Sequence, residues 1–157
     1  MISIQDKKDC CGCNACVQKC PMQCITMHED GEGFLYPKVD LDKCVNCHLC
    51  EKVCPCLNQN EPQEPFSCYA AKNNNEAIRE QSSSGGIFTA VAEKVIAERG
   101  VVFGVRFDKS WQVVHAWAET REDLAALRGS KYVQSQIGET FVQTEALLKK
   151  GCQVLFS

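Results

Sequence analysis

The stretches CCGCNACVQKCP (residues 10–21) and CVNCHLCEKVCP (residues 44–55) carry the strongest pattern in this chain. Each follows the spacing C-x2-C-x2-C-x3-C-P. This spacing allows three thiolates of one tight loop to reach the same cubane of iron and sulfide, while the fourth thiolate reaches a second cubane. The proline ends the short helical turn that carries the fourth cysteine and directs the chain away. Two copies of the pattern therefore predict two [4Fe-4S] clusters.

The eight cysteines of the two stretches are the predicted metal ligands. In the two-cluster arrangement of which this spacing is typical, the fourth cysteine of each stretch ligates the cluster of the other stretch. One cluster is thus expected on Cys10, Cys13, Cys16 and Cys54, and the other on Cys44, Cys47, Cys50 and Cys20. Residues 1–58 resemble a bacterial-type ferredoxin domain with two [4Fe-4S] clusters, and the resemblance covers all eight cysteines and both prolines.

Three other uses of these cysteines have to be weighed. Structural zinc sites favour two CxxC pairs separated by about 15 to 20 residues and have no use for an overlapping third pair. Disulfides need an oxidising compartment, which nothing in the sequence indicates. Residues 44–48 (CVNCH) match the haem-attachment pattern C-x-x-C-H, but Cys50, Cys54 and Pro55 follow in ferredoxin register. The iron–sulfur interpretation is therefore favoured.

The rest of the composition narrows the function. The chain has 157 residues, a formal net charge of −3 and thirteen cysteines. The five cysteines outside the ligand positions are interpreted as small buried side chains or bystander thiols; they are Cys11, Cys24, Cys56, Cys68 and Cys152. The sequence contains no basic patch with interleaved aromatic residues, no run of about 18 apolar residues and no signal-peptide pattern. We therefore expect a cytoplasmic protein with no nucleic-acid partner and no membrane span.

A polar segment divides the chain. Residues 59–65 contain two prolines and predict a linker between a domain of residues 1–58 and a second domain of residues 66–157. In the first domain, residues 25–28 and 34–39 flank a turn segment and predict a β-hairpin. This domain has few large apolar side chains, so cluster ligation is expected to supply much of its folding energy.

The second domain has a pattern of alternating strands and helices. Strands are expected at residues 66–71, 101–107, 111–118 and 152–156, and helices at about 76–80, 87–99, 121–128 and 137–150. The chain stops where an α/β domain would begin its next βα loop, so we expect this domain to be truncated. The expected fold class is α+β, with a two-cluster ferredoxin-like module followed by an incomplete α/β domain.

Residues 82–86 read SSSGG, directly before the helix expected from residue 87. Backbone N–H groups and the positive end of the helix dipole favour an anion at such a place, and glycine lets a phosphate approach closely. A simple N-cap followed by a turn has the same pattern, so the motif alone leaves both interpretations open. A second polar run, GSKYVQS at residues 129–135, combines a cation, an aromatic ring and hydrogen-bonding groups. By itself such a run is more often a solvated loop.

Three stretches of the second domain resemble the coenzyme F420 hydrogenase/dehydrogenase beta-subunit family: SSGGIFT (83–89), GVVFG (100–104) and LRGSKYVQS (127–135). The similarity runs from about residue 66 to the last residue, and a preceding ferredoxin domain is common in that family. The resemblance implies a flavoprotein with iron–sulfur clusters that passes electrons between one-electron carriers and a two-electron acceptor such as coenzyme F420. It carries over five candidates for FAD binding: Ser84, Gly85, Gly86, Lys131 and Tyr132.

The leading hypothesis is thus an iron–sulfur flavoprotein oxidoreductase with two [4Fe-4S] clusters and FAD. Its partner would be a redox protein, or a flavin or deazaflavin substrate. A second hypothesis is a non-enzymatic, ferredoxin-type electron carrier whose C-terminal part serves for docking, and a third is a truncated, inactive product that binds clusters. No general acid–base pair is identified. His48 is predicted to lie at the surface, and His115 to pack on a sheet face.

Overall fold

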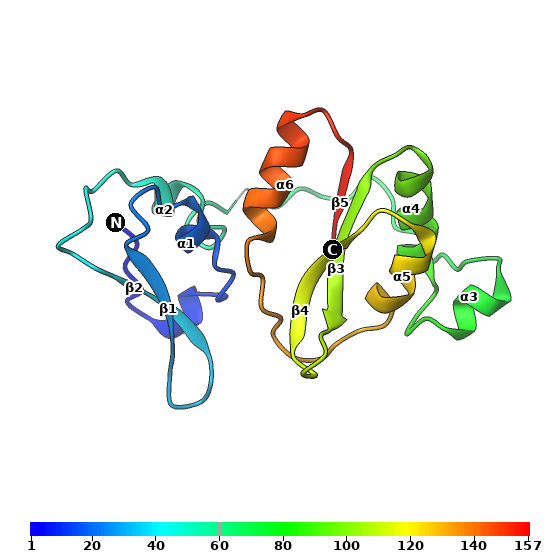
Figure 1. Cartoon of the computed structure of the whole chain (residues 1–157), viewed down its shortest axis with the longest axis horizontal. Coiled ribbons are helices and arrows are strands. Elements are labelled where there is room, and N and C mark those ends of the chain that lie inside the picture. The colour runs from blue at the N-terminus through cyan, green and yellow to red at the C-terminus, as the bar shows by residue number, and fades with distance from the viewer. Residues whose placement is uncertain (60) are drawn as a thin grey trace. The chain divides into compact units, whose positions relative to one another are not determined.

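The computed structural model of the chain describes residues 1–59 and 61–157 (Figure 1). It divides into two units, Met1–Glu64 and Pro65–Ser157. The division falls within residues 59–65, the segment for which a linker is predicted, and Asn60 of that segment lies outside the described residues. Each unit has its own core, so the two are described separately.

The N-terminal unit contains a β-hairpin. Strands β1 (Ile25–Glu29) and β2 (Leu35–Val39) pair antiparallel. Asp30 stabilises the turn between them, because its Oδ1 accepts hydrogen bonds from two backbone N–H groups of the turn. The Nζ of Lys7 also bonds this carboxylate and is the main reason that the pKa of Asp30 is lowered to about 2. The predicted hairpin is confirmed.

The two cysteine loops repeat the same backbone geometry. Helix α1 (Ala15–Lys19) follows the first loop, and helix α2 (Leu49–Lys52) follows the second, beginning 34 residues later. A short 3-10 helix, η1 (Lys7–Asp9), precedes the first loop. Four residues at matching positions have a left-handed backbone: Gly12, Asn14, Asn46 and His48. A left-handed residue beside a right-handed one lets successive backbone N–H groups face a common anion. The sequence repeat is therefore also a structural repeat.

The core of the N-terminal unit consists largely of cysteine. Its buried residues, each at most 8% exposed, are Ile2, Cys16, Cys24, Ile25 and Cys50. Two isoleucines form a very small hydrophobic core for a unit of this length. The cohesion of this unit therefore depends mainly on what its cysteines bind.

The C-terminal unit is built on a three-stranded sheet with the order β4-β3-β5. The central strand β3 (Val101–Phe107) pairs antiparallel with β4 (Val113–Ala118) and parallel with β5 (Val154–Phe156). The outer edge of β4 is partly covered by Gln136. Its N–H donates to the carbonyl of Val113 at 2.8 Å, and its carbonyl accepts from the N–H of His115 at 2.9 Å.

Helices cover both faces of this sheet (Figure 1). Helices α4 (Ile87–Ala97) and α5 (Arg121–Leu127) pack on one face, and α6 (Thr140–Lys149) packs on the other. The buried residues between the sheet and the first two helices are Ala92, Val95, Val102, Ala118, Leu124 and Leu127. Because side chains alternate along a strand, Val102 faces this core while Phe103 faces α6.

An aromatic stack fills the space between α6 and the sheet. The ring of Phe156 lies between 5.4 and 5.5 Å from the rings of Phe103, Phe141 and His115. The Nδ1 of His115 also lies 2.8 Å from the hydroxyl of Ser135. Burial lowers the pKa of His115 below its usual value of 6.5. The expectation that His115 packs on a sheet face is confirmed.

Two of the predicted helices begin at the capping residue that the sequence indicates, and one begins later. Helix α3 (Glu76–Glu80) begins after Asn75, whose side chain accepts from the N–H of Ile78. Helix α5 begins after Thr120, whose hydroxyl accepts from the N–H of Asp123. Helix α6 begins three residues later than predicted, after a bend at Gly138 with φ of 54°.

The strand predicted at residues 66–71 is wrong. No strand is assigned there, and the side chains of Phe66 and Tyr69 are fully or almost fully exposed. The local alternation favours a strand, but no neighbouring strand pairs with this segment in the described residues. The α+β fold class is confirmed, with a ferredoxin-like N-terminal unit.

Replacing Leu124 with alanine should destabilise the C-terminal unit by about 2–5 kcal/mol, because this side chain is 0% exposed and its removal leaves a cavity. The matched control is Leu148→Ala on α6, where the leucine is 55% exposed, so the loss should stay below about 1 kcal/mol. Urea unfolding followed by tryptophan fluorescence measures both, because both tryptophans of the chain lie in this unit. Equal losses in the two variants would contradict the core described above.

The stability of the C-terminal unit should also fall as the pH drops below about 6.5. The pKa of His115 is lower in the folded unit than in the unfolded chain, so the unfolded chain takes up the proton first. The loss should begin near 6.5 and continue until the pH passes the pKa of the folded unit. His115→Asn should weaken this dependence, measured as urea midpoints between pH 7.5 and 5. An unchanged slope in the variant would assign the effect to other groups.

Candidate functional site

Six cysteines surround a first cavity in the N-terminal unit. Three of them, Cys10, Cys13 and Cys16, come from the first loop, and Cys54 comes from the residues that follow α2. The remaining two are Cys11 and Cys56. The rest of the wall is mainly apolar and consists of Ile2, Ile4, Asn14, Met27 and Pro37. The cavity thus combines three predicted ligands of one loop with the fourth predicted ligand of the other.

A second cavity has the reciprocal composition. Cys44, Cys47 and Cys50 of the second loop line it together with Cys20, the residue directly after α1. Cys24 is a fifth cysteine on this wall, and the other lining residues are Met1, Met22, Ile25, Val39, Val45 and His48. The first cavity has a volume of about 320 Å³ and the second a volume of about 330 Å³, both measured out to the rim of the opening. The two cavities therefore match in size as well as in cysteine pattern.

The surroundings of the thiols affect their ionisation in opposite directions. Burial raises the pKa of Cys16 from 9.0 to about 11, and the neighbouring Cys13 adds to this effect. A buried thiol in this state keeps its proton unless a cation compensates the charge of the thiolate. At Cys20 burial acts in the same direction, but hydrogen bonds from Cys24 and from backbone N–H groups outweigh it and lower the pKa. The Sγ atoms of Cys20 and Cys24 lie 3.4 Å apart.

Backbone N–H groups also approach the sulfur atoms of two further cysteines. The N–H of Ile2 donates to the Sγ of Cys50 at 3.2 Å, and that of Gly12 donates to the Sγ of Cys10 at 3.5 Å. In addition, the Oδ1 of Asn14 at the first cavity is buried without a hydrogen-bond partner. The two N–H donors favour negative charge on these sulfur atoms, as in cluster-bound thiolates, whereas the unsatisfied oxygen of Asn14 is an acceptor and adds nothing to this argument.

Each cavity has four predicted ligand cysteines among the cysteines of its wall, and four thiolates are the donor set that a [4Fe-4S] cluster takes. Within residues 1–59 and 61–157, no three histidine, cysteine or carboxylate groups converge closely enough to hold a single metal ion. The predicted ligand thiols line two cavities and do not converge on a single ion position. The residues present therefore fit two iron–sulfur clusters.

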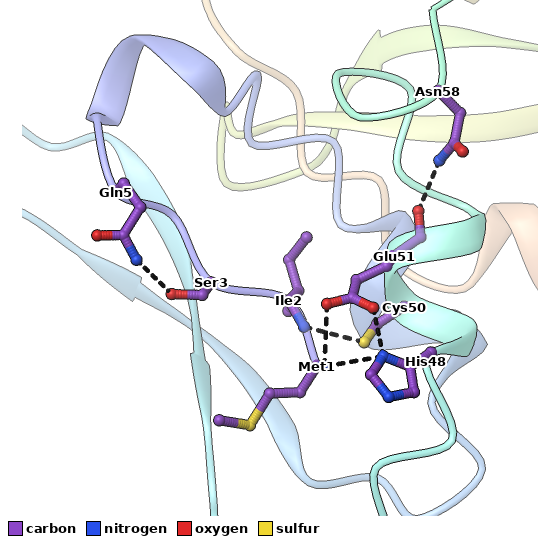
Figure 2. A network of polar contacts seen from close by, with 8 residues as sticks. All are labelled: Met1, Ile2, Ser3, Gln5, His48, Cys50, Glu51 and Asn58. Carbon is purple, nitrogen blue, oxygen red and sulfur yellow. Dashed lines mark hydrogen bonds and ion pairs between the residues drawn. The ribbon is translucent and has the colours of Figure 1, made fainter.

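His48 and Glu51 form a polar network beside the second cavity (Figure 2). The Nδ1 of His48 lies 2.5 Å from one carboxylate oxygen of Glu51, and the backbone nitrogen of Met1 lies 3.0 Å from the other. These partners lower the pKa of Glu51, with the bond from His48 as the largest cause. The side chain of His48 is 59% exposed, as its predicted surface position requires. Sequence reasoning missed Glu51, because its contact with Met1 joins residues far apart in the chain.

The C-terminal unit contains a larger pocket, which we call the serine–glycine pocket. It opens at the N-terminus of α4 and holds about 1050 Å³ counted out to the rim. Residues 82–89 form one side, and residues 127–131 form the other. The hydroxyl of Ser83 joins the two sides, because it lies 3.1 Å from the hydroxyl of Ser130 and accepts the Ser130 N–H at 3.2 Å.

Two glycines shape this pocket. A Cβ atom on Gly85 would lie 2.5 Å from the carbonyl oxygen of Ala71, so only glycine fits there. Gly86 has φ of 73° and precedes the first residue of α4. The chain can therefore bring its backbone close to a ligand at this helix end.

Two cationic side chains line the pocket. Arg128 and Lys131 both line it, and no aspartate or glutamate does among the described residues. The Nε of Arg128 donates to Thr89 at 3.2 Å, and its Nη1 donates to Gln81 at 2.8 Å. Burial lowers the pKa of Lys131. The arrangement can hold an anion such as a phosphate.

Four of the five residues for which flavin binding is expected line this pocket: Ser84, Gly85, Gly86 and Lys131. The fifth, Tyr132, is not among the lining residues, and its side chain is 92% exposed. Sequence reasoning did not select Arg128, although it directly precedes the loop that holds Lys131. A cation next to a glycine-containing polar loop is a signal that could have found it.

None of the helices in the described ranges has the length and apolar character that crossing a bilayer requires.

Two family models match the chain. The model for 4Fe-4S dicluster domains matches residues 9–58. The model for coenzyme F420 hydrogenase/dehydrogenase, beta subunit N-term, matches residues 68–141. Each match falls on one of the two units.

Curated relatives include several ferredoxins. A 7Fe ferredoxin of Hydrogenibacillus schlegelii is 38% identical over 64 residues, which are 39% of this chain and 76% of the ferredoxin. A ferredoxin of Mycolicibacterium smegmatis is 35% identical over 75 residues, 46% of this chain and 65% of the ferredoxin.

One polypeptide of the H(2):CoB-CoM heterodisulfide,ferredoxin reductase of Methanothermobacter marburgensis is 30% identical over 73 residues. These are 38% of this chain but only 11% of that polypeptide, so the chain spans a small part of this relative. Taken with the two cysteine cavities, the matches show that the chain belongs to the ferredoxins through a 4Fe-4S dicluster domain, and that the residues after this domain are similar to the N-terminal domain of the coenzyme F420 hydrogenase/dehydrogenase beta-subunit family.

Proposed function

We propose that this chain transfers electrons through two [4Fe-4S] clusters whose ligands cross between the loops. One cluster would be held by Cys10, Cys13, Cys16 and Cys54, and the other by Cys20, Cys44, Cys47 and Cys50. The observation that carries this proposal is the composition of the two cavities, each with three cysteines of one loop and the fourth of the other. When bound, such clusters accept and release single electrons. The dicluster family match and the ferredoxin relatives support iron–sulfur electron transfer as the general activity.

The chain's own residues hold the clusters and keep water away. The apolar wall of the first cavity, with Ile2, Ile4 and Met27, limits the access of water to the thiolates. Since the buried thiols favour the protonated state, loading with iron must release their protons, and it should become weaker as the pH falls.

For the C-terminal unit the proposal is a flavin site in the serine–glycine pocket. Ser84, Gly85 and Gly86 would approach the phosphates of FAD at the N-terminus of α4, and Lys131 and Arg128 would balance their charge. Tyr132 remains a candidate for contact with the ring system. A flavin would join the one-electron chemistry of the clusters to two-electron chemistry with a flavin-type or deazaflavin-type acceptor, or with a redox partner protein. The chain would then act as an iron–sulfur flavoprotein oxidoreductase.

The ferredoxin relatives favour a second candidate function. Their printed names describe electron carriers, and they match 39–46% of this chain. In this alternative the chain is a non-enzymatic carrier, and its C-terminal unit serves only for docking. Flavin content distinguishes the two functions.

Pairs of cysteine substitutions test the crossed ligands. In Cys20→Ser/Cys47→Ser both changes fall on one proposed cluster, so the reconstituted chain should keep about four of about eight iron atoms. In Cys20→Ser/Cys13→Ser the changes fall on both clusters, and the iron content should approach zero. Iron analysis after anaerobic reconstitution measures both, with Cys68→Ser as the control because this cysteine is exposed and lies in the other unit. The reverse result would show that the ligands do not cross.

Flavin binding tests the second part of the proposal. The chain should bind about one FAD, and Lys131→Met should weaken binding about 10- to 100-fold through the loss of a hydrogen bond from a charged donor. Lys109→Met, in the exposed turn between β3 and β4, is the matched control and should bind like the unchanged chain. Quenching of flavin fluorescence gives the affinities. Full iron loading without flavin binding would favour the electron carrier.

A further inference from the structure

The first residues of the chain form a segment that contacts both cysteine cavities. We call residues 1–5 the strap. Met1 lines the second cavity, whereas Ile2 and Ile4 line the first. Ile2 is only 4% exposed and belongs to the small core of the unit. The strap is therefore placed to influence both cavities. It contacts the first with apolar side chains and the second with a hydrogen-bond donor.

At the second cavity the strap provides a hydrogen-bond donor. The backbone N–H of Ile2 donates to the Sγ of Cys50 at 3.2 Å (Figure 2). Both residues are buried, with Cys50 at 7% exposure, so water does not compete for this bond. A hydrogen bond in such surroundings acts more strongly on the charge of the sulfur than it would at the surface.

Glu51 holds the strap in this position. The backbone nitrogen of Met1 lies 3.0 Å from its Oε1, and His48 bonds the other carboxylate oxygen. The carbonyl oxygen of Glu51 accepts from the side chain of Asn58 at 2.6 Å. Because Glu51 directly follows Cys50 on α2, the same helix carries the sulfur and the group that positions its donor.

Cys16, which matches Cys50 in the repeat, has a backbone donor in its neighbour Val17, but within the described residues the strap donates no hydrogen bond to a sulfur atom of the first cavity. The strap reaches it with the side chains of Ile2 and Ile4, which are apolar. On its hairpin side the wall consists of Met27 and its cross-strand neighbour Pro37, and proline has no N–H to donate. The bond that Gly12 makes to Cys10 is longer, at 3.5 Å.

We propose that the strap raises the reduction potential of the cluster on Cys20, Cys44, Cys47 and Cys50 above that of the other cluster, with the Ile2 N–H as the donor and Glu51 as the positioning residue. The inference rests on the cluster assignment proposed above. A donor aimed at a ligand sulfur stabilises the reduced state more than the oxidised state, because the reduced state carries more negative charge. The strap thereby separates the potentials of two clusters whose protein loops are otherwise repeats of each other.

Replacing Ile2 tests the donor directly. Ile2→Pro removes the N–H and keeps an apolar side chain, whereas the control Ile2→Val keeps both. In redox titrations of the iron-loaded chain followed by electron paramagnetic resonance, Ile2→Pro should shift one of the two midpoint potentials to a more negative value and leave the other unchanged. Ile2→Val should leave both unchanged. An equal shift of both potentials, or of neither, in a fully loaded variant would overturn the proposal.

Replacing Glu51 tests the positioning role without a change in the strap. Glu51→Gln should shift the midpoint potential that Ile2→Pro shifts, also to a more negative value but by a smaller amount. Glu51→Asp keeps the carboxylate, so its shift should be smaller than that of Glu51→Gln. Glu32→Gln, an exposed carboxylate of the hairpin turn, controls for the loss of a negative charge and should give no selective shift. A Glu51→Gln profile equal to that of Glu32→Gln would overturn the role of Glu51. Iron near zero in the unchanged chain would instead refute the cluster assignment.

Discussion

Buried cysteine thiols are the constraint on which the N-terminal unit depends. Three of the five buried core residues are cysteines, and two of these stand at ligand positions. A thiol contributes little apolar surface, and a thiolate cannot remain buried without a compensating positive charge. The unit therefore cannot obtain its stability from hydrophobic burial alone. Metal ligation would supply both the missing cohesion and the missing charge.

This constraint explains the shape of the two loops. A chain that has to surround a cluster with three cysteines in seven residues must reverse direction within a few bonds, and the left-handed residues around Cys13 and Cys47 allow this. Asparagine and glycine tolerate such a backbone best, but His48 adopts it as well. The histidine is stabilised there by its contact with Glu51. A residue that resembles part of a haem-attachment pattern thus has a structural role in a different kind of site.

The features that could be predicted from sequence are those with a local physical cause. Ligand spacing is set by covalent reach, so the cysteines that share a cavity could be assigned in advance. The hairpin at Asp30 and the caps at Asn75 and Thr120 follow from side chains that bond the adjacent backbone. The strand predicted at residues 66–71 failed because a strand needs a partner, which propensity does not provide. The contacts of Arg128 and the contact between Glu51 and Met1 could not be predicted, because they join residues that are 39 or more positions apart in the sequence.

The covered edge of β4 has a consequence for how the C-terminal unit behaves in concentrated solution. An open strand edge offers unpaired N–H and C=O groups to any other extended chain, and such edges promote aggregation. Gln136 occupies two of these groups on β4, and its side chain also bonds Gln112 at 2.9 Å. A single residue outside the regular sheet thus blocks the simplest register for a second copy to extend it. The loop that connects α5 to α6 therefore leaves fewer backbone groups of this edge open to a second copy.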